Sequence, residues 1–224
     1  MKHYIKQKLR ESLLNEELSY EDKIINLLKS GDESNIELAY AVGKGQKINV
    51  DELVKSIYGK FLLNKAKWKT IKDRLLYLTN LKELDLSYTN LTTLPKGISN
   101  LTNLEWLYLE DNNLTSLPEG ISNLTNLRVL NLNNNELTTL PKGIDKLTNL
   151  KMLNLGWNNL PSLPEGISKL TNLERLDLEN NELTNLEGIE NLTNLEWLDL
   201  QRNPISDSEK ARIKKLLPDT DIEF

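Results

Sequence analysis

Leucine recurs along residues 81–205 with a period that the rest of the chain lacks. Six leucines mark it, separated by four steps of 23 residues and a last step of 22: Leu81, Leu104, Leu127, Leu150, Leu173 and Leu195. Each begins the same frame of apolar positions, which reads L-x-x-L-x-L-x-x-N-x-L in residues 104–114 and 127–137. A period of this length is typical of repeat proteins, whose units bury their apolar edges against one another.

Two leucines of each pattern stand two residues apart, which predicts a short strand with one apolar side. In the first repeat Leu84 and Leu86 point inward, whereas Glu83 and Asp85 point outward. Stacked repeats then form a parallel sheet with one strand per repeat. We expect the asparagine that follows each strand to bury its amide and bind backbone groups in the turn. These residues are Asn112, Asn135, Asn158, Asn181 and Asn203, and the first repeat has Thr89 instead.

The second half of each repeat reads L-P-x-G-I, as in residues 117–121. Proline removes a backbone donor and glycine permits a tight bend, so we expect no long helix on this outer arc. The fifth repeat lacks the proline, which accounts for its 22 residues.

The spacing of leucine and asparagine resembles the leucine-rich-repeat family over more than half of the chain. The resemblance implies an α/β solenoid, a horseshoe with a parallel concave sheet. It also implies a binding protein, since members of this family bind many unrelated partners. We expect the solenoid to span residues 75–205, as a half-repeat followed by six strand repeats.

Both ends of the chain differ from the repeats. Residues 1–74 show apolar positions at helical spacing and two helix-start patterns, Ser19 with Asp22 and Asn49 with Glu52. We interpret them as an all-α N-terminal cap over the first strand. Residues 206–224 predict a C-terminal cap, in which a helix ends before Pro218 and an edge strand follows. The tail is similar to the C-terminal cap common in the family, so we expect the array to be complete.

Composition and charge disfavour a disulfide-linked, membrane-spanning or nucleic-acid-binding protein. There is no cysteine, and no apolar run approaches the roughly 18 residues of a membrane span. The basic first residues lack the apolar stretch of a signal peptide, so we expect a soluble cytoplasmic protein, although a secreted form after signal removal has the same features. Residues 1–78 carry a net charge of +4 and residues 79–224 one of −9. An acidic solenoid disfavours nucleic-acid binding, because phosphates need basic residues.

A catalytic function finds little support in the residues. The one histidine is His3, and no nucleophile pattern is present. Carboxylates are plentiful on the predicted strand face, but in an open curve we expect them to lack the burial that raises a pKa. We therefore expect a non-enzymatic protein that needs no metal and no cofactor.

Outward positions of the strands carry the candidate binding residues. The first outward column begins with Glu83, Trp106, Val129 and Met152, and three of the four tryptophans in the chain fall on this face. Large aromatic residues with methionine and arginine, rimmed by acids, are typical of protein-binding surfaces. The predicted partner-binding residues are Tyr88, Trp106, Tyr108, Glu110, Asp111, Val129, Met152, Trp157, Arg175, Asp177, Trp197 and Asp199.

The leading hypothesis is a monomeric protein–protein interaction module whose concave face binds a protein partner with basic patches. Two alternatives stay open at this point. Aromatic residues beside carboxylates and asparagines also suit carbohydrates, which would make this a carbohydrate-binding protein. The basic N-terminal region also suits a structural or assembly component of a bacterial surface or phage particle.

Overall fold

The computed structural model describes residues 19–29, 36, 39–40, 44, 48–54, 78–94 and 96–224. The chain divides into two compact units, one of residues 1–81 with 95–101 and the other of residues 82–94 with 102–224. Residues 1–18 of the predicted N-terminal cap lie outside the described residues, as do residues 75–77 of the predicted half-repeat. The boundary between cap and solenoid therefore stays a prediction.

In the first unit, two predicted helix starts are present. Helix α2 spans Tyr20–Lys29, and the Ser19 hydroxyl oxygen accepts the Asp22 N–H at 3.1 Å. The Asn49 side-chain oxygen accepts the Glu52 N–H at 3.3 Å, where residues 50–54 are helical. Such side-chain caps satisfy N–H groups that have no partner inside the helix. The same unit contains the 3-10 helix η1, Lys96–Asn100.

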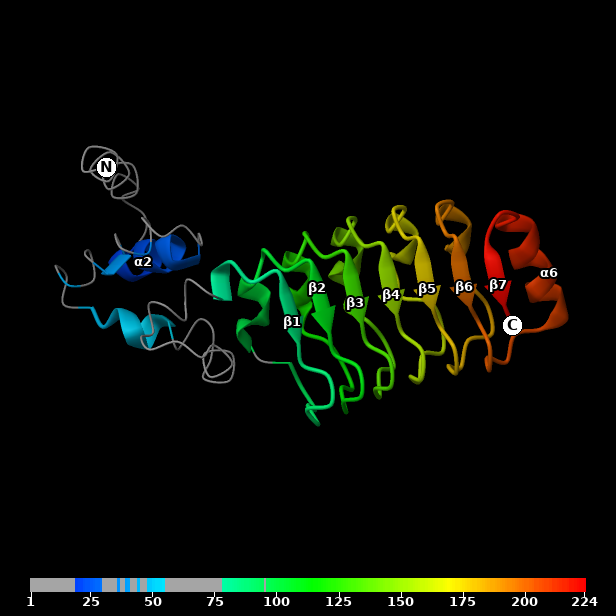
Figure 1. Cartoon of the computed structure of the whole chain (residues 1–224), viewed down its shortest axis with the longest axis horizontal. Helices are drawn as coiled ribbons and strands as arrows, with labels where there is room; N and C mark the ends of the chain where they lie inside the picture. The colour runs from blue at the N-terminus through cyan, green and yellow to red at the C-terminus, as the bar shows by residue number, and fades with distance from the viewer. Residues whose placement is uncertain are drawn as a thin grey trace. The chain divides into compact units, whose positions relative to one another are not determined.

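The second unit is a solenoid with an open, seven-stranded parallel sheet whose strands follow sequence order (Figure 1). Every strand has three residues, with a leucine or isoleucine at its centre and outward side chains on either side. The strands are β1 Glu83–Asp85, β2 Trp106–Tyr108, β3 Val129–Asn131, β4 Met152–Asn154, β5 Arg175–Asp177, β6 Trp197–Asp199 and β7 Asp221–Glu223.

The core of the solenoid lies between the strands and the outer arc. Leu107, Leu130, Leu153 and Leu176, the central residues of four successive strands, are fully buried. The outer arc has only short 3-10 helices, as the proline and glycine predict: η2 Glu119–Asn123, η3 Lys142–Lys146, η4 Ile167–Lys169 and η5 Ile189–Asn191. Pro118 and Pro141 precede η2 and η3 in an extended conformation.

Buried asparagines join each repeat to the one before it, which confirms their predicted role. Asn135 Nδ2 donates to the carbonyl oxygens of Leu109 and Leu132 at 3.0 Å, and its Oδ1 accepts the Leu114 N–H at 3.0 Å. The first repeat departs from this pattern as expected, because the Thr89 hydroxyl there donates to the Leu86 carbonyl at 2.6 Å.

The C-terminal elements form as predicted. Helix α6, Asp207–Leu216, begins at Ser206, whose hydroxyl accepts the Glu209 N–H at 3.3 Å. Lys214 and Lys215 lie in its last turn, where a positive charge interacts favourably with the helix dipole. Strand β7 then pairs in parallel with β6 and completes the sheet.

Candidate functional site

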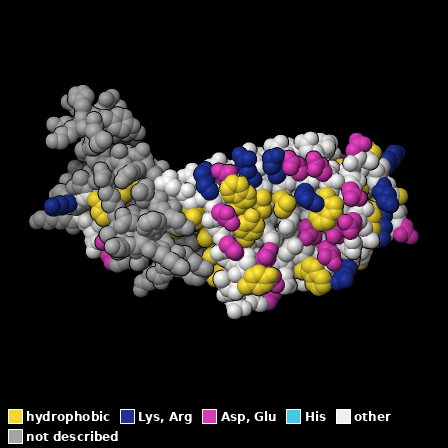
Figure 2. Space-filling view, viewed as in Figure 1, with side chains coloured by type: hydrophobic (Ala, Val, Ile, Leu, Met, Phe, Trp, Pro, Cys, Tyr) yellow, Lys and Arg dark blue, Asp and Glu magenta, His cyan; other side chains and the backbone are white. Residues whose placement is uncertain are grey.

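The outward side chains of β1–β7, with the two residues after each second strand leucine, form one continuous surface that we call the strand face. Neighbouring strands keep an unbroken register, so that Glu83, Trp106, Val129, Met152, Arg175, Trp197 and Asp221 form its first column. The same register places Asp85, Tyr108, Asn131, Asn154, Asp177, Asp199 and Glu223 in its second column. Figure 2 shows hydrophobic side chains on this surface, interspersed with acidic ones.

The structure brings all twelve sequence-predicted binding residues onto the strand face, with different exposure. Tyr88 and Trp157 are the most exposed of its aromatic side chains, at 70% and 43%. Asp199 is the one member that is buried, at 8% exposure. The remaining members are half-buried or exposed: Trp106, Tyr108, Glu110, Asp111, Val129, Met152, Arg175, Asp177 and Trp197.

A row of apolar side chains crosses three successive strands of the first column. Trp106 pairs with Val129, which pairs with Met152. All three are half-buried. Neighbouring strands lie about 4.8 Å apart, so the three side chains form one patch about 10 Å long. Leucines fill the core beneath, so the fold does not need this patch for its own packing.

Two tryptophans are held in matching clusters with a carboxylate and an arginine. Trp157 Nε1 donates to Glu179 Oε2 at 3.1 Å, and the Arg202 guanidinium carbon lies 5.1 Å from the Trp157 ring centroid. Trp197 Nε1 likewise donates to a Glu223 carboxylate oxygen at 3.1 Å, and Arg175 lies 5.4 Å from the Trp197 ring centroid. Such cation–π contacts hold exposed rings in one orientation. The sequence columns contained these residues, but their pairing depends on the relative placement of neighbouring repeats.

A polar network crosses the centre of the strand face over Gly156. Asn133 Oδ1 accepts the Gly156 N–H at 2.8 Å, and Asn133 Nδ2 donates to Asp177 Oδ2 at 2.9 Å. A Cβ on Gly156 would lie 2.8 Å from Asp177 Oδ1, so a side chain there would displace the carboxylate. Sequence reasoning missed this glycine, although it is the one residue without a side chain among the outward positions of the repeats.

The last residues of the strand face share a backbone conformation that sequence reasoning also missed. Six repeat-equivalent residues have a φ of 52–56°: Tyr88, Asp111, Asn134, Trp157, Asn180 and Arg202. This left-handed conformation suits asparagine and aspartate but costs a large side chain about 1 kcal/mol or more. Tyrosine, tryptophan and arginine therefore occupy three of these positions at a cost to stability.

Asp199 corrects the expectation that carboxylates of this face are too open to have a raised pKa. Burial raises the pKa of the Asp199 carboxyl, and the negative charges of Asp177, Glu223 and Glu179 add to the effect. The Gln201 N–H, which donates to Asp199 Oδ1 at 2.8 Å, acts in the opposite direction. The expectation considered six strands, and the seventh places Glu223 directly beside Asp199.

The Asp199→Asn variant is expected to be more stable than the wild type at pH 7. Because the folded pKa of Asp199 is raised, the native state binds more protons than the unfolded chain above pH ~4, and its stability falls as the pH rises through this window. Asparagine removes that loss and still accepts the Gln201 N–H. Urea unfolding at pH 7 and pH 3 measures this, and the gain should vanish at pH 3. Asp85→Asn, which changes an exposed carboxylate of the same column, should alter stability little at either pH.

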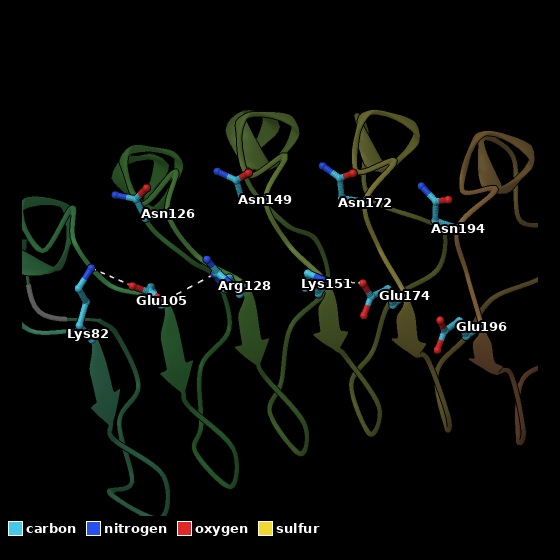
Figure 3. A pocket seen from close by; sticks show the side chains of 10 residues that line it. All are labelled: Lys82, Glu105, Asn126, Arg128, Asn149, Lys151, Asn172, Glu174, Asn194 and Glu196. Carbon is cyan, nitrogen blue, oxygen red and sulfur yellow. Dashed lines mark hydrogen bonds and ion pairs between the residues drawn. The ribbon is translucent and has the colours of Figure 1, made fainter.

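Beside the strand face, at the start of the strands, lies a polar groove of about 680 Å³ (Figure 3). On one side, asparagine side chains link neighbouring repeats by hydrogen bonds. Asn126 Nδ2 donates to the Thr102 carbonyl at 2.8 Å, and Asn149, Asn172 and Asn194 make the equivalent bond. On the other side are charged residues that pair with one another, such as Glu105 with Lys82 at 2.8 Å. The groove therefore satisfies most of its own polar groups.

Within the described part of the chain, no three histidine, cysteine, aspartate or glutamate residues are grouped so as to hold a metal ion. None of the helices in that part is both long and apolar enough to cross a membrane.

Comparison with known proteins agrees with this architecture. Residues 119–218 match the model of a leucine-rich repeat region, and residues 60–114 match that of a leucine rich repeat. No curated protein matches the chain. A solved leucine-rich-repeat protein of Leptospira interrogans is 43% identical, with a TM-score of 0.64 over 70% of this chain. This chain spans 40% of that protein's length. The two family models and the solved structure agree, and the chain belongs to the leucine-rich-repeat family.

Proposed function

We propose that this protein is a non-enzymatic interaction module whose strand face binds a protein partner. Leucine-rich-repeat domains generally mediate protein–protein interactions and are typically not enzymes. The observation that carries the proposal is the half-buried row of Trp106, Val129 and Met152, in register on three neighbouring strands. Apolar side chains in the centre of a face with polar edges are typical of the residues that dominate binding energy.

The charge of the strand face indicates the character of the partner. Nine carboxylates lie on it: Glu83, Asp85, Glu110, Asp111, Asp177, Glu179, Asp199, Asp221 and Glu223. Its cations are two arginines, Arg175 and Arg202, and both lie against tryptophan rings. A partner with basic patches complements this surface, and its binding should weaken as salt screens the charges.

The test is capture of partners from the lysate of the native host by the wild type and by the triple variant Trp106→Ala, Met152→Ala, Trp197→Ala. We expect the triple variant to lose a protein that the wild type retains, with affinity at least about 30-fold lower, because each truncation removes a central contact. Circular dichroism first establishes that both fold equally. A second triple variant, Lys142→Ala, Lys146→Ala, Glu165→Ala, changes exposed residues of the outer arc and should retain the partner.

Equal capture by the wild type and by the strand-face variant would show that the partner binds elsewhere, and the basic N-terminal region would become the candidate surface. A glycan array run beside the capture addresses the carbohydrate alternative. Glycan binding that the strand-face variant loses would replace the protein partner with a carbohydrate.

A further inference from the structure

The Trp157 cluster has a simple description in terms of the repeat. The ring belongs to Trp157, which occupies the positive-φ position of one repeat. The carboxylate belongs to Glu179, which directly precedes the positive-φ position of the next repeat. The cation, Arg202, occupies the positive-φ position two repeats on. Arg202 Nε also lies 3.4 Å from Glu179 Oε1, so the cation is bound by both the ring and the carboxylate.

The same positions recur at the other end of the sheet without the cation. Tyr88 takes the place of Trp157, and Glu110 follows it by 22 residues, as Glu179 follows Trp157. The backbone contact also matches, because the Tyr88 N–H donates to the Glu110 carbonyl at 3.1 Å and the Trp157 N–H to the Glu179 carbonyl at 2.7 Å. Asn134 stands where the Trp157 cluster has Arg202, and it donates to Asp111 instead.

Negative charge around Tyr88 has no lysine or arginine counter-ion among the described residues. The Tyr88 ring is 70% exposed. A hydrogen bond to Asp111 raises the pKa of its phenol, as do the charges of Asp111, Glu110 and Asp85. In the described part of the chain, none of these three carboxylates forms an ion pair with lysine or arginine. Glu110 and Asp111 accept hydrogen bonds from the neutral amides of Asn131 and Asn134, which leave the negative charges in place. An exposed ring beside such carboxylates is suited to a cation from another molecule.

We infer that Tyr88, Glu110 and Asp111 form a binding site for an arginine side chain of the partner. The guanidinium stacks on the Tyr88 ring and pairs with the carboxylates, as Arg202 does within the chain at Trp157. A planar guanidinium makes both contacts at once, which a lysine ammonium does less well. This inference rests on the proposed partner binding of the strand face, and it names one group that the partner contributes.

The test uses an acetylated hexa-arginine amide as the probe and isothermal titration calorimetry at about 0.1 M salt with the full chain. We expect the wild type to bind the peptide, and Asn134→Arg to bind it at least about tenfold more weakly, because its own guanidinium occupies the Tyr88 ring. Tyr88→Ala, which removes the ring without adding charge, should show a similar loss. The matched control is Asn180→Arg, with the same charge change at the same backbone conformation. It lies about 19 Å from Tyr88 along the sheet, beyond the screening length, and should stay within about threefold of the wild type.

Two results would overturn the inference. One is a wild type that does not bind hexa-arginine at about 1 mM, a weak limit for a specific contact. The other is an equal loss in Asn134→Arg and Asn180→Arg, which would mean that the peptide responds to net charge alone. The triple variant Trp106→Ala, Met152→Ala, Trp197→Ala keeps the Tyr88 cluster and should bind the peptide like the wild type. If that variant also keeps the partner from the lysate, the proposed function fails while the arginine site stands.

Discussion

The Asn158→Ala variant is expected to lose about 3 kcal/mol of unfolding free energy, because the alanine leaves several buried backbone groups without partners. Asn158 Nδ2 donates to the carbonyl oxygens of Leu132 and Leu155 at 3.0 Å and of Gly156 at 3.1 Å. Its Oδ1 accepts the Leu137 N–H at 2.9 Å. The side chain is 5% exposed, so water cannot readily replace these bonds.

The neighbouring Asn159 provides a matched control. Its side chain is exposed and has no hydrogen bond to any residue of the described part of the chain. Asn159→Ala should therefore change the free energy of unfolding by less than about 0.5 kcal/mol. Urea unfolding followed by circular dichroism measures both variants. Equal losses would mean that the buried amide does not hold the repeats together.

The repeat pattern predicts most of the solenoid, because spacing alone determines which side chains point inward. Leu84 and Leu86 are buried and Glu83 and Asp85 are exposed, as the alternation in 83–86 requires. The columns of the strand face follow from the same spacing, since parallel strands of equal repeats pair in register. The short outer arc could also be predicted, because proline and glycine exclude a long helix there.

Contacts between side chains of different repeats could not be predicted from spacing. Whether Arg202 lies over Trp157 or points into solvent depends on rotamers and on the offset between repeats. The positive φ of Tyr88 and Trp157 could not be predicted from the sequence for another reason. Asn134 and Asn180 mark the conformation in other repeats, but tyrosine and tryptophan are not typical of it. The arginine site becomes visible only when the structure shows how a ring, a carboxylate and a guanidinium of successive repeats contact one another at Trp157.

We expect different residues of this surface to determine the stability of the fold and the affinity for a partner. Trp157 and Tyr88 occupy left-handed positions that asparagine occupies in other repeats, and their rings lie outside the core. A side chain that lowers stability and packs against little of the fold is one whose value lies in an external contact. Under the proposed function, the strand face combines a fold supplied by leucine and asparagine with recognition supplied by the outward residues.

Adjacent residues of β4 test this separation directly. Leu153→Ala should lower the free energy of unfolding by about 3–4 kcal/mol, because Leu153 is fully buried and its truncation leaves a cavity between neighbouring repeats. Met152→Ala should lower it by less than about 1 kcal/mol, because Met152 is half-buried on the strand face and pairs only with Val129 and Arg175 beside it.

Urea unfolding measures the free energy of unfolding of both variants, with the same dependence on urea concentration used for each. Partner capture should show the opposite order, with Met152→Ala weakened and Leu153→Ala retained at temperatures where it is folded. Because the two residues are neighbours in sequence, chain position and local strand propensity are shared between them. A large stability loss from Met152→Ala would mean that the apolar row supports the fold, and its exposure would no longer point to a partner. A small loss with weakened capture leaves binding as the reason for a tryptophan, a valine and a methionine in register on the strand face.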